Sequence, residues 1–174
     1  TDVLLNGNNL SNNSEFDHYL KRFGYKFKNE NKEFGGYAIL KNKKISLIMD
    51  VGSAPAAKFS KNYQSGALSF ELISDGKKLI SNCGYSSTKN SKLNKLSKST
   101  AAHSTLIIDD YSSCRYEKVD KKNSIIVDSL KILKKNIIFE KNYWKIKASH
   151  NGYFKKYNSI HEREIEFYPE QFRF

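Results

Sequence analysis

The feature that most constrains this chain is a succession of short segments in which apolar and polar residues alternate. Alternation puts every second side chain on the same face of a β-strand, so that one face can pack in a core. Leu68, Phe70 and Leu72 share a face in this way. We predict strands at residues 36–40, 45–50, on both sides of 75–76, and at 106–109, 125–133, 137–140, 143–148 and 161–168.

The connections between these segments favour an antiparallel arrangement. The dipeptide Asp75-Gly76 accepts the positive φ angles of a tight hairpin turn. Residues 84–100 are rich in Ser, Lys and Asn, and they predict a long exposed loop. The chain has two prolines and no convincing long helix. Many short strands joined by tight turns predict an all-β fold, an antiparallel β-sandwich.

The two ends of the chain differ from its middle. Residues 1–34 are polar and Asn-rich, with one short helical patch at 15–20, and we expect a linker or the end of a preceding domain. Residues 35–174 carry the strand pattern and form the predicted sandwich domain. Because the chain starts at Thr1 and stops within a β pattern at Phe174, we expect a sandwich truncated at both ends.

Charge narrows the range of partners. The net charge is +12, and the basic excess is almost all lysine. Lysine and asparagine share AT-rich codons, so part of this excess can reflect genome composition. A basic surface attracts polyanions: nucleic acid, anionic lipid or acidic polysaccharide. No nucleic-acid-binding motif is visible and arginine is scarce, so an acidic polysaccharide fits better than nucleic acid. No apolar run approaches the ~20 residues of a membrane span.

Two cysteines leave the redox state open. Cys83 and Cys114 can pair in an oxidising compartment or remain two separate thiols.

Four stretches together carry a family resemblance. They are YQSGALSFELISDGKKLISNCG at 63–84, AAHST at 101–105, ASHNGY at 148–153 and IHER at 160–163. In order and spacing they resemble the C-terminal domain of the heparinase II/III-like polysaccharide lyases, over residues 36–168. The resemblance implies a supersandwich-like fold and a periplasmic or secreted location. It also implies an N-terminal α/α toroid in the same protein, which carries the catalytic tyrosine and much of the substrate groove.

The resemblance assigns candidate roles to several residues. His103 is the candidate catalytic residue, in a motif that helps build the cleft; the competing interpretation is a histidine packed at a strand end. The candidate substrate-binding residues are Tyr63, Gln64, His150, Tyr153, His161 and Arg163. Tyr153 could stack on a sugar or cover the core, and Gly152 suits a close backbone approach. His161 and Arg163 share a strand face, where they could bind a carboxylate or simply meet solvent.

The sequence departs from the family where metal ligands are expected. Some members hold a structural zinc near this histidine, but Gln64 stands where closer relatives have histidine. Asn82 stands at the position of the acidic ligand. Neutral amides are poor zinc ligands, so we expect no metal site and no cofactor. A Cys83–His103 metal pair is conceivable but incomplete.

These observations predict one wall of a lyase cleft. The parent protein is expected to cleave uronic-acid-containing glycans by β-elimination, and the fragment alone is expected to be inactive. The alternative is a non-catalytic carbohydrate-binding or structural β-sandwich. Gln64 and Asn82, which depart from the family pattern, favour this alternative. A glycosidase needs two suitably spaced carboxylates, whereas Glu162, Glu164 and Glu166 look solvent-facing. Nucleic-acid binding remains open on charge alone.

Overall fold

The computed structural model describes residues 18, 21–24, 33–84, 91–119, 124–171 and 173. Antiparallel strands dominate these residues. The strands are β1 (Glu33–Phe34), β2 (Tyr37–Lys41), β3 (Ile45–Asp50), β4 (Phe70–Ser74), β5 (Lys77–Ile80), β6 (Arg115–Lys118), β7 (Ser124–Asp128), β8 (Ile132–Phe139), β9 (Trp144–His150) and β10 (His161–Phe167). The helical elements are η1 (Ala57–Phe59), α2 (Ser91–Lys98), η2 (Thr100–Ala102) and α3 (Phe154–Tyr157).

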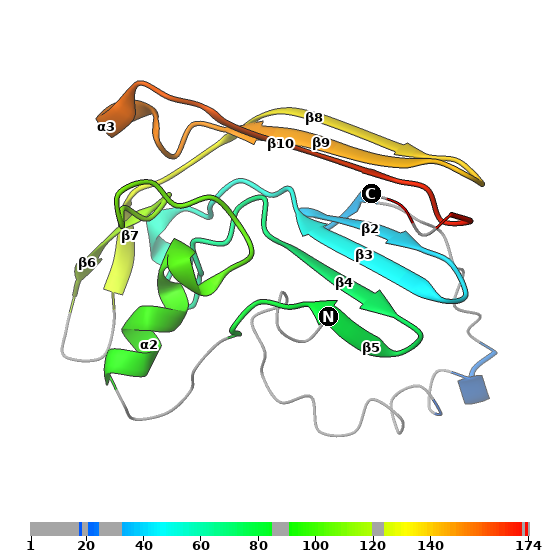
Figure 1. Ribbon diagram of the computed structural model, residues 1–174. Coiled ribbons are helices and arrows are strands. Elements are labelled where there is room, and N and C mark those ends of the chain that lie inside the picture. Colours follow the sequence, from blue (N-terminus) through cyan, green and yellow to red (C-terminus); the bar gives the residue numbers. More distant parts are fainter. Residues whose placement is uncertain are drawn as a thin grey trace.

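The strands form two layers and a small ribbon. One sheet has the order β1-β2-β3-β4-β5, and the second has the order β10-β9-β8. In Figure 1 the second sheet lies as a layer over β2, β3 and β4, while β6 and β7 pair as a separate ribbon near α2. This arrangement confirms the predicted all-β fold built from antiparallel sheets.

The core lies between the two layers. It combines Leu40, Leu47 and Met49 of the first sheet with Trp144 and Ile146 of the second. Along β9, every second residue from Trp144 is buried, and the lysines between them are half-buried on the other face. The period of two therefore predicted the inward face of this strand correctly.

The turn between β4 and β5 follows the expected chemistry. Asp75 and Gly76 both have positive φ, at 47° and 76°. Glycine adopts positive φ freely because it has no Cβ, and aspartate tolerates it better than most residues, which is why Asp-Gly favours tight hairpins.

One predicted strand is wrong. Within residues 106–109, the only pairing is a single bridge between Ile108 and Tyr111. The intervening Asp109 and Asp110 have φ values of 47° and 57°, so the chain reverses at once. The apolar run Leu106-Ile107-Ile108 therefore leads into a turn, and no ladder forms.

Two other predicted strands have different boundaries. The segment 125–133 is divided between β7 and β8, and the segment 137–140 is mostly the end of β8. The interruption lies at Leu130, which is fully buried in a small second cluster and whose carbonyl accepts the Ala54 N–H. At this point the chain passes from the β6–β7 ribbon to the sheet formed by β8, β9 and β10.

The polar segment 84–100 is not a continuous loop. Residues 91–98 form α2, whereas 85–90 lie outside the described residues. Lys98 ends the helix with a buried side chain, and its ammonium donates to the Lys61 carbonyl at 2.6 Å and to Ser124 Oγ at 3.1 Å. Lysine and leucine are good helix formers, and this anchoring holds the helix end against the domain.

Both cysteines are free thiols. Cys83 is exposed, whereas Cys114 is buried in the second cluster, where burial raises the pKa of its thiol to about 12. The second of the two alternatives, separate thiols, is therefore observed.

The predicted linker and its helical patch at 15–20 fall largely outside the described residues. In the part of the chain that is described, no helix is long and apolar enough to cross a membrane.

Candidate functional site

Three segments far apart in the sequence are tied together beside the core. They are the loop before β4, the end of β5 and the segment after η2. Ser104 makes the ties: its N–H donates to Asn82 Oδ1 at 2.7 Å, and its hydroxyl donates to the Phe70 carbonyl and accepts the Phe70 N–H. The Thr105 hydroxyl donates to the Ala67 carbonyl at 2.9 Å. We call this region the polar junction, defined by residues 64–70, 82–83 and 100–105.

His103 lies inside the polar junction. Its half-buried ring packs on Gly66, where a Cβ atom would lie only 3.2 Å from the ring Cγ. Burial lowers the pKa of His103, against an opposing hydrogen bond with the Ser97 backbone. The ring Nε2 is buried and has no partner. His103 follows η2, and because the predicted strand at 106–109 does not form, this histidine does not lie at a strand end.

Gln64 and Asn82 belong to the polar junction with His103, whereas Tyr63 packs against the second cluster. All three carry a buried polar atom without a partner: Tyr63 Oη, Gln64 Nε2 and Asn82 Nδ2. Burial raises the pKa of the Tyr63 hydroxyl well above its usual value. The structure thus joins residues that the sequence places in two separate motifs, while their binding roles stay predictions.

A second group of candidate residues lies where β9 and β10 pair. His150 and His161 are directly opposite each other, and His150 Nε2 is 3.0 Å from His161 Nδ1. The Gly152 N–H donates to His150 Nδ1, so a neutral His150 carries its proton on Nε2 and donates to His161. Burial lowers the pKa of His150 to about 3 and that of His161 to about 4.

Gly152 permits a close approach, as expected. A Cβ atom there would lie 2.5 Å from the Ser113 carbonyl oxygen, closer than real contacts allow. Next to it, Tyr153 is fully buried and its hydroxyl donates to the Leu106 carbonyl at 2.6 Å. Of the two expectations for Tyr153, covering the core describes its position here.

Arg163 links the second group to the polar junction. It lies on the same face of β10 as His161, and its Nη1 donates to the carbonyls of Leu68 and Ser104. The guanidinium also lies over the Phe70 ring, 5.5 Å from its centroid. One guanidinium nitrogen is therefore occupied by the protein itself, and binding of a carboxylate by the His161–Arg163 pair stays a prediction.

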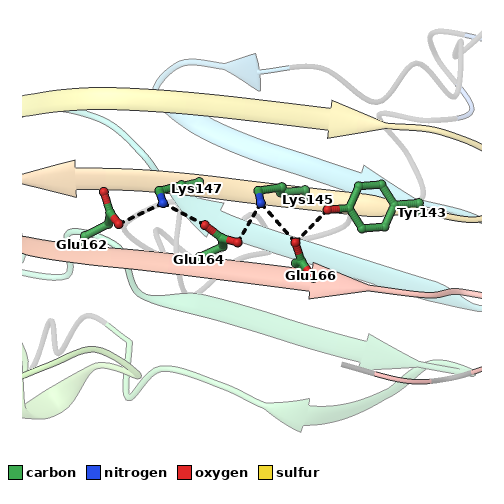
Figure 2. A network of polar contacts seen from close by, with 6 residues as sticks. All are labelled: Tyr143, Lys145, Lys147, Glu162, Glu164 and Glu166. Carbon is green, nitrogen blue, oxygen red and sulfur yellow. Dashed lines mark hydrogen bonds and ion pairs between the residues drawn. The ribbon is translucent and has the colours of Figure 1, made fainter.

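The carboxylates of β10 form a ladder of ion pairs with lysines of β9. We call it the ionic ladder; it lies on the face of the β10-β9-β8 sheet that points away from the core. Figure 2 shows the alternating order along the ladder: Glu162, Lys147, Glu164, Lys145, Glu166 and Tyr143. The four ion pairs have N–O distances of 2.7 to 3.0 Å. Hydrogen bonds from both lysines lower the pKa of Glu164 to about 2. Such paired, ionised carboxylates provide no protonated acid for a glycosidase.

The residues do not fit the zinc that the family resemblance implies. Asn82 Oδ1 is already the acceptor of the Ser104 N–H, and the buried amide nitrogen Nδ2 is left without a partner. Amide nitrogens donate hydrogen bonds and have no lone pair for a cation. Among the described residues, no group of three or more His, Cys, Asp or Glu side chains is placed to hold a metal.

Several residues in and beside the polar junction were not predicted from the sequence. Ser104 and Thr100 connect its segments through hydroxyl bonds to the Phe70 and Ser65 carbonyls, and Glu71, at the edge of the junction, is fully buried. Glu71 Oε1 accepts the Asn82 N–H at 3.3 Å. The only available signal was the run Ser104-Thr105 after His103, because short hydroxyl side chains often bond to backbone.

Comparison with known proteins identifies the family. A family model described as "Heparinase II/III-like, C-terminal" matches residues 31–174, so the chain belongs to this family. No curated protein sequence matches the chain. The fold is similar to a heparan sulfate lyase HepC mutant from Pedobacter heparinus, with 15% identity and a TM-score of 0.62. It is also similar to the structure titled heparinase III, with 18% identity and a TM-score of 0.56.

The chain spans only part of these proteins. The alignments cover 89% and 91% of this chain, but 25% of the HepC mutant and 26% of heparinase III. Such a match supports the β-sandwich fold of the domain, and most of each relative has no counterpart in this chain.

Proposed function

We propose that this domain forms one wall of the substrate cleft in a lyase that cleaves uronic-acid-containing glycans by β-elimination. The observation that carries the proposal is the family match over 31–174, within which the polar junction holds His103. As part of the same proposal, the rest of the cleft belongs to an N-terminal α/α toroid. The protein then works in the periplasm or outside the cell, where such polysaccharides are met.

The chemistry divides naturally between two domains. Neutralising the uronate carboxylate acidifies the C5 proton; a base removes this proton, and the C4–C5 double bond forms as the glycosidic oxygen leaves with a proton from an acid. His103 suits the base or a group beside it, because its lowered pKa keeps the ring neutral near pH 7. The tyrosine that the family resemblance implies belongs to the toroid.

The second candidate is a non-catalytic carbohydrate-binding or structural sandwich. Gln64 favours it, because glutamine cannot exchange a proton where closer relatives have histidine. The burial of His150, Tyr153 and His161 points the same way, since these side chains support the fold from inside. The two candidates differ in whether His103 affects turnover.

The first experiment tests the division of labour. We expect the 174-residue chain alone to show no lyase activity on heparan, alginate and similar glycans, because the proton-transfer groups lie mostly on the other domain. The measurement is the absorbance of unsaturated uronate products, with the longer protein as positive control. Sustained turnover by the isolated chain would refute this arrangement.

The second experiment tests His103 in the longer protein. We expect His103→Ala to reduce turnover by about 10²-fold or more, the range for loss of a general acid or base. His103→Gln keeps hydrogen-bonding capacity and should be equally impaired. His18→Ala, at an exposed position without a proposed role, is the matched control. Unchanged turnover in a folded His103→Ala protein would favour the second candidate.

A further inference from the structure

Buried polar atoms without partners gather in the polar junction. Six such side-chain atoms occur in the described residues, and four of them belong to Gln64, Ser69, Asn82 and His103. The exposed fractions of Gln64, Ser69 and Asn82 are 7%, 1% and 6%. A buried polar group without a partner destabilises the folded state, because it has lost its hydrogen bonds to water. Four at one place therefore point to a ligand that satisfies them together.

The fold brings the segments that carry these four side chains to one region. Ser69 Oγ and the His103 ring both contact the Cα side of Gly66: a Cβ there would lie 3.2 Å from Ser69 Oγ and 3.4 Å from His103 Cδ2. Asn82 is joined to the residue after His103 by its 2.7 Å hydrogen bond with the Ser104 N–H. Gln64 precedes Gly66 by two residues, and its carbonyl accepts the Gly66 N–H.

The hydrogen-bonding capacities of the four atoms are complementary. Gln64 Nε2 and Asn82 Nδ2 are donors. His103 makes a hydrogen bond with the Ser97 backbone, and Nε2 has no partner, so this bond is made by Nδ1–H. In a neutral ring with its proton on Nδ1, Nε2 is an acceptor. The Ser69 hydroxyl can accept. Two donors and two acceptors match the two lone pairs and two hydrogens of one water molecule.

We propose that Gln64, Ser69, Asn82 and His103 hold one buried water molecule where the family resemblance implies a structural zinc. The domain then keeps its fold without metal. Gln64 and Asn82, which stand where the resemblance implies zinc ligands, are the residues that replace metal binding by water binding. This inference concerns the architecture of the polar junction and does not depend on lyase activity.

The first test measures thermal unfolding with and without zinc. The unaltered chain should have the same melting temperature in EDTA and in excess Zn²⁺. Gln64→His/Asn82→Asp adds an imidazole and a carboxylate beside His103, enough for a three-ligand zinc site. This variant should bind one Zn²⁺ per chain by calorimetry and melt roughly 5 °C higher with zinc than with EDTA.

Two controls make the result specific. Adding His103→Ala to the double variant should abolish the zinc effect. Gln171→His/Asn136→Asp makes the same change in composition at exposed positions and should respond to zinc no more than the unaltered chain. Stoichiometric zinc binding by the unaltered chain that is lost in His103→Ala would overturn the proposal.

The second test holds even if the double variant does not fold. A high-resolution crystal structure of the unaltered chain grown with Zn²⁺ should show a solvent peak within hydrogen-bond distance of Gln64 Nε2, Asn82 Nδ2 and His103 Nε2. Data collected at the zinc edge should show no anomalous signal there. An anomalous peak at this position, or no solvent peak at all, would contradict the inference.

Discussion

At the scale of residues, His150 and His161 share one hydrogen bond in a setting where neither is easily charged. Their ring centroids are 4.9 Å apart, and Arg163 adds a positive charge nearby. Burial is the largest cause of both lowered pKa values. The charge of Arg163 lowers both further, and the charge of His161 also lowers the pKa of His150. Protonation of either ring therefore acts against the folded state.

The sign of the pH effect follows from this direction. Both folded-state pKa values lie below the usual value of about 6.5, so between pH 6.5 and pH 4 the unfolded chain binds protons that the folded chain does not. The free energy of unfolding should therefore fall as the pH falls through this window. Burial raises the pKa of Asp50 to about 7, and this group contributes in the opposite direction, losing stability as the pH rises.

A variant separates the two contributions. In His161→Asn, the amide oxygen replaces Nδ1 as acceptor for His150, and one titrating ring is removed. We expect the unfolding free energy of this variant to depend less steeply on pH between about 6.5 and 4.5 than that of the unaltered chain. Urea unfolding at several pH values measures both slopes, and the contribution of Asp50 is common to both. Equal slopes would show that His161 does not titrate in this window.

Single residues also show how far local pattern can be trusted. In the sequence, Gln64 and Asn82 lie in one motif and His103 in another, and the structure brings the segments that carry them together in the polar junction. The burial of Glu71 was not predictable, because Glu71 alternates with Phe70 and Leu72 on the face that a half-buried strand normally exposes. Glu71 accepts the N–H of Asn82, which follows the neighbouring strand β5, and Ser104 bonds to the backbone of Phe70 across 34 residues of sequence.

At the scale of elements, the two faces of β9 contribute very differently to stability. Ile146 is fully buried in the core, and its replacement by alanine should cost about 2–5 kcal/mol. Lys145, its neighbour in sequence, belongs to the ionic ladder on the outer face (Figure 2). Ion pairs near solvent contribute little, since side-chain entropy and solvent screening oppose them.

We therefore expect Lys145→Ala to destabilise the domain several-fold less than Ile146→Ala. Its effect should also shrink in about 1 M salt, where charges are screened beyond about 3 Å. Chemical unfolding at low and high salt measures both variants side by side. A loss for Lys145→Ala that matches the core variant and resists salt would mean that the ladder is a main source of stability.

Elements were predicted best where the period of two continued without interruption. Strand β10 was predicted nearly to the residue, and β9 follows the pattern from Trp144 to Ala148, two residues short of its end. The segments 91–98 and 106–109 had no such continuous pattern. Lys98 and the two aspartates with positive φ decided their structure through a long-range anchor and a local reversal.

At the scale of the whole molecule, charge and fold point to different aspects of binding. The net charge of +12 attracts any polyanion, whereas the proposed function requires binding of a glycan. We expect the chain to bind heparan sulfate at low salt and to lose affinity steeply as salt rises. At about 0.15 M salt, binding to heparan sulfate should exceed binding to duplex DNA of similar length.

Fluorescence titration with labelled heparan sulfate and labelled DNA across a salt series tests this. A clear preference for the glycan that persists at physiological salt supports recognition beyond charge. Equal affinities with equal salt slopes would reduce the interaction to nonspecific attraction by lysines. Tighter binding to DNA would favour the nucleic-acid alternative left open by composition.

The sequence by itself determined the family, the antiparallel sheets and the inward faces of the longer strands. These properties depend on periodicity, turn residues and motif order, which are local. Only the tertiary structure decided which polar residues are buried, where strands are interrupted, and that Gln64, Asn82 and His103 meet as an amide-lined junction. Those properties depend on which distant segments cover each face, and a period of two contains no information about the partner that packs against it.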